Sequence, residues 1–369
     1  MSAPAAVQDA YGRLKRWLVA DALPLWATCG LDPAGGFFER LGQDGEPTNA
    51  PKRSRVQARQ AYVFATAAER GWMPEAQARA AAVHGLDALN ATRRADGFYV
   101  TPGPRPVTLD GMGELYDQAF ALFAFAAGHG LTGGYEAEAD ALRKALAPYA
   151  HPLAGFAEAP GHAQPLFANP NMHLFESFMA WQAVSPDPAW AEQAAALAWL
   201  ALDRLTAGPG LVLEQYDADW RLPAERVVWP GHLYEWAFLL LRHDAADAKH
   251  RNTALWLIQQ AEAKGVARGV AVFALDGQLR PVDRGARLWA QTERLRVVAT
   301  AAAFRDDSGL WDAALEAAEA VEAFLATPIP GLWRDWMDEV GGFRDEPAPA
   351  SSFYHIVGAI AELERLIER

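Results

Sequence analysis

A helical periodicity of apolar residues runs along nearly the whole chain and constrains its fold more than any other feature. Gly, Pro and Asx signals bound the periodic runs and predict twelve helices, at residues 6–28, 53–70, 74–93, 112–129, 133–149, 170–183, 187–206, 231–243, 247–264, 286–304, 309–326 and 352–368. Long connections alternate with short ones, so the helices group into six pairs. Because a pair of helices cannot bury its apolar face alone, neighbouring pairs must pack together.

The spacing of conspicuous polar and aromatic residues supports this grouping. The even-numbered helices carry one such residue each, 57 to 62 positions apart: Arg59, Tyr116, His173, His232, Glu293 and His355. Six units in a ring predict an all-α (α/α)6 barrel, in which the even-numbered helices form the inner layer and present their N-termini and the long loops at one mouth. An open solenoid of the same helix pairs is the alternative.

The long loops carry turn signals such as Leu275-Asp-Gly-Gln-Leu279, which predict short β-hairpins inside them. The sequence has no linker and no low-complexity segment. We therefore expect one catalytic domain spanning residues 1–369.

Composition and charge exclude several classes of partner. The net charge of -13, with no basic run, argues against nucleic acid or an anionic membrane. Cys29 is the single cysteine, so the chain can form neither an internal disulfide nor a thiolate metal cluster. It has no signal-peptide pattern and no stretch of eighteen apolar residues, and we expect a cytoplasmic protein. The oligomeric state, including a homo-oligomer, is left open.

Three of the nine histidines fall at the starts of apolar helices. His232 follows Pro230-Gly231 and precedes Glu235 by three residues, so both side chains lie on one helical face. His173 follows a predicted Asn169 cap, and His355 follows a predicted serine cap at Ser351-Ser352. The positive end of a helix dipole favours neutral imidazole, which can accept a proton. The alternative is that each histidine simply packs at the start of its helix.

Three further positions are candidate ligand-binding residues. Arg59, facing an apolar interior, requires a carboxylate or a sugar oxygen as its partner, although a surface arginine fits the sequence equally well. The Tyr116 hydroxyl is a candidate ligand contact, although tyrosines are commoner as core residues. Trp289 and Glu293, one turn apart, offer an apolar platform beside a hydrogen-bond acceptor.

Sequence motifs exclude some activities and leave others open. The chain has no Gly-x-Ser-x-Gly, P-loop or Gly-x-Gly-x-x-Gly motif, which excludes serine hydrolase, NTPase and dinucleotide-binding functions. Three histidines and a glutamate are potential zinc or manganese ligands, but no His-x-His or His-x3-His spacing occurs. We therefore expect no metal and no cofactor.

Six motifs in this order resemble the N-acylglucosamine 2-epimerase family of (α/α)6-barrel sugar epimerases and isomerases. They are Arg55-Val-Gln-Ala-Arg59, Tyr116-Asp-Gln-Ala-Phe120, Asn171-Met-His173, Pro230-Gly-His-Leu-Tyr-Glu235, Trp289-Ala-Gln-Thr-Glu293 and Phe353-Tyr-His355. No single motif is specific, but their order is, and the resemblance covers essentially the whole chain.

The resemblance implies a role for each candidate residue. His355 and His232 would be the general acid/base pair beside the sugar, and His173 would assist ring opening. Arg59 and Tyr116 would hold sugar oxygens near C1 and C2. The resemblance also implies proton transfer without a metal.

Within that family, Leu288 and Ala350 stand where cellobiose epimerases typically have stacking tryptophans. The chain looks more like the branch that interconverts D-mannose and D-fructose through a cis-enediol. Alternatives are 2-epimerisation of N-acylglucosamine or another aldose, isomerisation of mannose 6-phosphate, a glycosidase using carboxylates such as Asp117 and Glu293, and a sugar-binding protein without catalysis. Every alternative takes a small carbohydrate as its ligand.

Overall fold

The computed structural model describes residues 3–101, 114–161, 164–206 and 211–368. All twelve predicted helices are present in it, with bounds that differ by a few residues from those predicted. The first two residues of the helix predicted at 112–129 lie outside the described residues. The chain forms two compact units: the first comprises Met1–Leu31, Phe38–Ala50 and Val228–Arg369, and the second comprises Asp32–Phe37 and Pro51–Val227. The expectation of a single domain stays a prediction.

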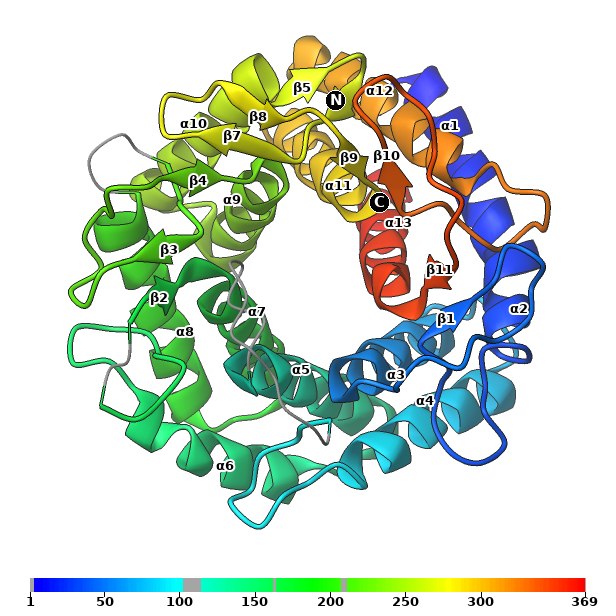
Figure 1. Ribbon diagram of the computed structural model, residues 1–369, viewed down its shortest axis with the longest axis horizontal. Coiled ribbons are helices and arrows are strands. Elements are labelled where there is room, and N and C mark those ends of the chain that lie inside the picture. The colour runs from blue at the N-terminus through cyan, green and yellow to red at the C-terminus, as the bar shows by residue number, and fades with distance from the viewer. Residues whose placement is uncertain (1–2, 102–113, 162–163, 207–210, 369) are drawn as a thin grey trace. The chain divides into compact units, whose positions relative to one another are not determined.

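The second unit contains three helix pairs in two layers. Its helices are α3 (Ser54–Glu69), α4 (Glu75–Asn90), α5 (Glu114–Thr132), α6 (Glu136–Ala145), α7 (Ala168–Val184) and α8 (Pro188–Leu200), with short η2 (Ala147–Tyr149) and η3 (Ala201–Leu205) segments. Helices α3, α5 and α7 pack side by side, and α4, α6 and α8 cover them (Figure 1).

The first unit repeats this arrangement. Its helices are α1 (Ala5–Trp17), η1 (Leu18–Ala22), α2 (Leu23–Trp26), α9 (Pro230–Asp244), α10 (Ala248–Gly265), α11 (Leu288–Arg305), α12 (Ser308–Leu325), η4 (Ala350–Ser352) and α13 (Phe353–Ile367). Helix α11 packs between α9 and α13, while α10 covers α9, α12 covers α11, and α1 packs on α12 and α13 (Figure 1).

The two layers differ in how much of each helix is buried. Pro230–Leu241 in α9 is buried without interruption, whereas α4 buries only the face that carries Ala78, Ala82, Leu86 and Leu89. A helix that is apolar on all sides must be covered on all sides, while an amphipathic helix can face solvent. This difference in the sequence assigns α9 and its neighbours to the covered layer. Among the described residues, none of the helices is long and apolar enough to span a bilayer.

Short strands occupy the long loops. They are β1 (Arg40–Leu41), β2 (Leu166–Phe167), β3 (Gln215–Tyr216), β4 (Val227–Val228), β5 (Val266–Ala267), β6 (Val270–Ala271), β7 (Ala274–Asp276), β8 (Pro281–Asp283), β9 (Ala286–Arg287), β10 (Trp336–Met337) and β11 (Ala348–Pro349). Strands β7 and β8 form the hairpin predicted around Asp276-Gly277, which confirms that prediction. Three antiparallel pairs, β1 with β11, β2 with β3 and β9 with β10, join one long loop to the next.

A side-chain amide near the start of four helices holds the preceding loop in place. Each amide accepts a hydrogen bond from a loop N–H at 2.6 to 2.9 Å and donates one to the carbonyl oxygen of the same residue at 3.0 to 3.1 Å. The pairs are Gln57 with Phe37, Gln118 with Tyr99, Asn171 with Phe156, and Gln291 with Ala271. Since both backbone groups are satisfied by one side chain, each loop is fixed beside its helix.

The same loops also cap the start of a neighbouring helix. Thr101 lies two positions beyond Tyr99 in one of these loops. Its hydroxyl accepts from the backbone N–H of Ser54, the first residue of α3, at 2.7 Å. Other loop acceptors serve further helices: the Glu214 carbonyl oxygen accepts from Ala168 N at 3.2 Å, and the Asp335 carbonyl oxygen accepts from Leu288 N at 3.1 Å. The first N–H groups of a helix have no acceptor within that helix. In these helices, a distant loop supplies an acceptor.

This capping by loops overturns two sequence predictions. Asn169 is not the cap of α7, because the helix begins at Ala168 and Asn169 lies inside it. The serine before α13 makes no side-chain cap either, and the Ser352 hydroxyl donates to Asp335 Oδ1 at 2.6 Å. At both helix starts a carbonyl oxygen of a distant loop accepts a backbone N–H instead: that of Glu214 from Ala168, and that of Glu39 from Ala350.

Candidate functional site

His232 lies in the first turn of α9, as the Pro-Gly signal predicted. Pro230 is the first helical residue, and Trp229 precedes it in extended conformation. The imidazole stacks on the Trp229 ring, with centroids 5.0 Å apart, and contacts the Trp289 ring at the same distance. Glu235 follows one turn later and is buried. His232 is thus held between two indoles.

His355, near the start of α13, is oriented by a carboxylate. Its Nδ1 lies 2.8 Å from Glu293 Oε1, and Glu293 is fully buried on α11. Because an ionised carboxylate can only accept, Nδ1 carries the proton in this pair and the neutral ring keeps its lone pair on Nε2. Arg296 Nη1 lies 3.4 Å from the other oxygen of Glu293. This arrangement leaves a His355 nitrogen that can act as a base.

Trp289 connects the two histidines. Its ring centroid lies 5.0 Å from that of His232 and 5.8 Å from that of His355. The side-chain ligand atoms of Glu235, Glu293 and His355 lie within 4.8 Å of one another. The first unit therefore brings five of the predicted residues together: two imidazoles, two carboxylates and an apolar platform.

These three ligand atoms are close enough for a metal ion, but two of the three residues already bond to each other. Glu293 accepts from His355 and is paired with Arg296, so a cation at Glu293 would compete with both donors. Two carboxylates and one imidazole suit a hard cation in general. The expectation that no metal is needed stays a prediction.

The second unit gathers the remaining predicted residues. Arg59 Nη2 donates to the Tyr116 hydroxyl at 2.6 Å, and its guanidinium lies 4.1 Å above the Phe120 ring. Arg55 pairs with Asp117 across 2.6 Å. Arg55 and Arg59 are buried, so the surface interpretation of Arg59 is wrong. An oxygen that it contacts here is the Tyr116 hydroxyl, and the prediction of a carboxylate or sugar oxygen as its partner stays a prediction.

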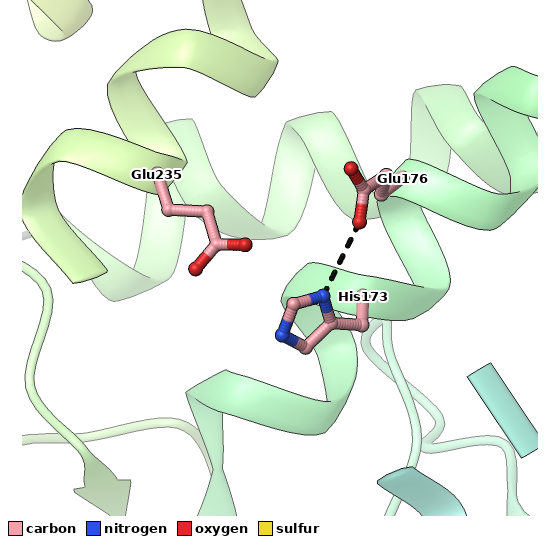
Figure 2. A group of neighbouring side chains, drawn as sticks. All are labelled: His173, Glu176 and Glu235. Atoms are coloured by element: carbon pink, nitrogen blue, oxygen red, sulfur yellow. Dashed lines mark hydrogen bonds and ion pairs between the residues drawn. The ribbon is translucent and has the colours of Figure 1, made fainter. Parts of the chain in front are cut away.

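His173 packs against the same cluster. Its ring lies edge-on to Tyr116, with centroids 5.1 Å apart, and 4.5 Å from Phe120. Its Nδ1 lies 3.3 Å from Glu176 Oε2 one turn along α7 (Figure 2). The sequence analysis missed Glu176, although its spacing from His173 equals that of Glu235 from His232. Arg59, Tyr116 and His173 therefore form one buried cluster.

The glycosidase alternative fits these contacts poorly. A glycosidase needs one carboxyl group that holds a proton for the leaving group. Asp117 is paired with the Arg55 guanidinium, and Glu293 accepts from His355 and lies beside Arg296. Both carboxylates are engaged by donors, whereas the imidazole Nε2 of His355 is suited to proton transfer.

Glu158, in the loop before α7, has an unusual titration. Burial raises the pKa of its carboxyl to about 7, against a smaller opposing effect of the Leu115 N–H, which donates to Oε2 at 3.5 Å. Its other oxygen is buried and has no hydrogen-bond partner among the described residues. The sequence offered no signal for this group.

This pKa predicts how stability depends on pH. Because the folded pKa lies above the unfolded value, the unfolded chain loses the Glu158 proton first, and stability falls as pH rises from about 4.5 to about 7. We expect Glu158→Gln to raise the Tm at pH 8 by roughly 2 °C and to leave it unchanged at pH 4. Calorimetry at both pH values measures these Tm changes. An equal change in Tm at pH 4 and pH 8 would rule out titration of Glu158 as the cause.

Several known proteins resemble this chain. The model of the family described as N-acylglucosamine 2-epimerase (GlcNAc 2-epimerase) matches residues 36–359. A mannose-6-phosphate isomerase of Rhizobium meliloti (strain 1021) is 41% identical over 379 residues, which cover 97% of each chain. A D-mannose isomerase of Thermobifida fusca is 29% identical over 321 residues, or 77% of each chain.

Solved structures resemble it over nearly its whole length. A D-mannose isomerase crystal structure matches with a TM-score of 0.85 at 20% identity, covering 99% of this chain and all of the other. The cellobiose 2-epimerase of Bacillus thermoamylovorans B4167 matches with a TM-score of 0.82 at 17% identity, covering 96% of this chain and 99% of that one. At these identities the likeness shows the fold, and it confirms the prediction of an all-α (α/α)6 barrel.

Proposed function

Because this chain belongs to the N-acylglucosamine 2-epimerase family, we propose that it is an isomerase that interconverts D-mannose and D-fructose. The family and its relatives identify a sugar isomerase or epimerase that acts on a small carbohydrate. The proposal is more specific in naming the sugar and the direction of proton transfer. It rests on the contact of Trp289 with both His232 and His355, the latter oriented by Glu293.

The arrangement suits proton transfer between adjacent carbons. In open-chain mannose, Nε2 of His355 takes the C2 proton, and the electrons of that bond move toward the C1 carbonyl oxygen. The resulting cis-enediolate carries its negative charge on O1; His232 accepts the proton of O2 and delivers it to O1, and the electrons left on O2 form the C2 ketone as the C1=C2 bond takes up a proton. His355 returns its proton to C1, and the product is fructose. The Trp289 ring offers an apolar surface for the sugar.

The residues of the second unit keep the roles that the resemblance implies. We propose that His173 assists ring opening and that Arg59 and Tyr116 hold oxygens near C1 and C2. These three side chains lie together in one buried cluster, as shared binding of one ligand requires.

Replacing Arg59 by lysine tests its proposed role. An ammonium cannot reproduce the planar donor fork or its stacking on Phe120, so we expect kcat/KM for mannose to fall by about tenfold or more. Steady-state kinetics measure the change, with Arg53→Lys, six residues earlier, as the control. Normal kinetics in Arg59→Lys would make Arg59 a purely structural residue.

A second substrate is favoured by a specific observation. The relative at 41% identity, with 97% of each chain covered, is named a mannose-6-phosphate isomerase. Mannose 6-phosphate is therefore the second candidate, and it would undergo the same C2-to-C1 proton transfer. Parallel assays with both sugars at equal concentrations compare kcat/KM directly.

Isotope labelling tests the reaction itself. We expect mannose carrying deuterium at C2 to give fructose that retains part of the label at C1, because one imidazole carries the proton between adjacent carbons and some exchanges with solvent. Activity should survive prolonged chelator treatment. Glucose as the dominant early product would identify an epimerase instead, and chelator loss reversed by manganese or zinc would identify a metal enzyme.

A further inference from the structure

Asp335 is not one of the predicted site residues, yet it bonds to two segments, one before Trp289 and one before His355. It precedes β10 and is 4% exposed. Its carbonyl oxygen accepts from Leu288 N at 3.1 Å. Its carboxylate accepts from Arg287 Nε at 2.9 Å and also from Arg287 Nη2 through Oδ2, and from the Ser352 hydroxyl at 2.6 Å through Oδ1.

Each of these segments leads directly into a candidate site residue. Arg287 and Leu288 immediately precede Trp289 at the start of α11. Ser352 immediately precedes α13 and lies one turn before His355. One carboxylate therefore links the start of the helix that carries Trp289 and Glu293 to the start of the helix that carries His355.

Capping α11 does not require this carboxylate. At equivalent loop positions Glu39 and Glu214 cap the neighbouring helices through their carbonyl oxygens, and Asp335 caps α11 in the same way. Its side chain is therefore available for a further role. The Arg287 side chain is 31% exposed, so solvent screens its ion pair with Asp335 and the pair contributes little net stability. The bonds from Arg287 to Asp335 and from Ser352 to Asp335 therefore matter more for the relative position of the two helix starts than for stability.

We propose that Asp335 is a positioning residue, which holds the Trp289–Glu293 segment and His355 in the mutual arrangement that proton transfer requires. It acts through Arg287 and Ser352 without touching the sugar. This inference rests on the proposed function of the same site, and it adds to it the reason why His355 is placed accurately.

The expected size of the effect follows from the geometry. Misplacing a reacting group by about 1 Å can cost about 10²-fold in rate. Asp335→Asn keeps the shape but loses the charge that Arg287 pairs with, and Ser352→Ala removes one donor. We expect kcat to fall about ten- to hundredfold in Asp335→Asn and by less in Ser352→Ala, with KM changing less than kcat in both. Both substitutions interrupt the same series of hydrogen bonds, from Arg287 through Asp335 to Ser352. The fold-loss of kcat in the double variant should therefore be smaller than the product of the two single fold-losses.

The experiment compares Asp335→Asn, Ser352→Ala and their double variant with wild type, and with Asp338→Asn as the matched control. Asp338 directly follows β10, as Asp335 directly precedes it, but the Asp338 carboxylate accepts from Val340 N and Gly342 N in the exposed turn. Kinetics are measured at equal folded concentration, well below the Tm. The ratio of deuterium transferred to C1 against deuterium lost to solvent is measured from labelled mannose, since partial unfolding lowers the yield and leaves this ratio unchanged.

A second readout needs no sugar. In protein carrying ¹³C-labelled histidine, the ring resonance of His355 is assigned from its loss in His355→Asn. We expect that resonance to move in Asp335→Asn and Ser352→Ala and to stay in place in Asp338→Asn. A lowered kcat with a changed label ratio and a displaced resonance supports the inference.

Wild-type kcat in Asp335→Asn, or a lowered kcat with an unchanged label ratio and resonance, would overturn it. Inactivity of the wild-type protein on mannose would contradict the proposed function alone. The histidine spectra would still decide whether Asp335 positions His355.

Discussion

His355→Asn and His232→Asn each lower kcat by about 10²- to 10⁴-fold, the usual loss when a positioned acid or base is removed. His355 is the larger loss, because it carries the C2 proton in the proposed reaction and Glu293 fixes its tautomer. Asparagine is polar, shorter than histidine and unable to transfer the proton near pH 7. We expect both variants to stay folded, because asparagine keeps a polar side chain with an N–H donor at each position. Steady-state kinetics and calorimetry on the same samples measure kcat and the Tm.

His250→Asn is the matched control for these variants. His250 also lies in the first turn of a helix, and its Nδ1 lies 2.8 Å from Asp247 Oδ1. It differs by lying on the outer helix α10, next to the exposed turn that follows α9. We expect wild-type kcat in this variant. A folded His232→Asn/His355→Asn double variant with wild-type turnover would refute the acid/base assignment.

Arg294→Ala should be the most destabilising of the substitutions considered. The Arg294 side chain is 1% exposed, and its guanidinium donates to both oxygens of Glu262 at 2.8 Å. It also donates to Glu316 Oε2 at 2.6 Å and to the Gly269 carbonyl oxygen at 2.9 Å. Removing the cation leaves the Glu262 carboxylate, which also accepts from the Tyr234 hydroxyl, without its main partner. We expect a loss of about 3 kcal/mol, at the lower end for a broken buried pair because Glu262 and Glu316 keep partial access to water.

Urea unfolding, followed by tryptophan fluorescence, measures this loss. The matched control is Arg13→Ala, which removes an exposed two-bond pair between Arg13 and Glu322 on α12. Solvent screens that pair, so the urea midpoint of Arg13→Ala should equal that of the wild type. Equal midpoint shifts in the two variants would contradict the role given to burial of Arg294.

Local pattern determined the helices and the residue types of the site. The periodicity of apolar residues placed all twelve helices, because burial of a helical face is written into spacings of three and four residues. Signals at helix starts, such as Pro230-Gly231 before His232, placed the imidazole in the first turn, because these signals act through adjacent residues. The glycine-centred hairpin at Asp276-Gly277 was predictable for the same reason.

Tertiary structure alone decided which groups became partners. Glu293 and His355 are 62 positions apart and lie 2.8 Å from each other, and Arg55 and Asp117, also 62 apart, form an ion pair at 2.6 Å. The sequence offered several carboxylates for each cation and no means of ranking them. The caps predicted at Asn169 and Ser352 did not form, and carbonyl oxygens of distant loops, at Glu214 and Glu39, accept from Ala168 N and Ala350 N at these helix starts. Local propensity sets what a residue can bond, whereas the packing of distant loops against helix starts sets which of those bonds forms.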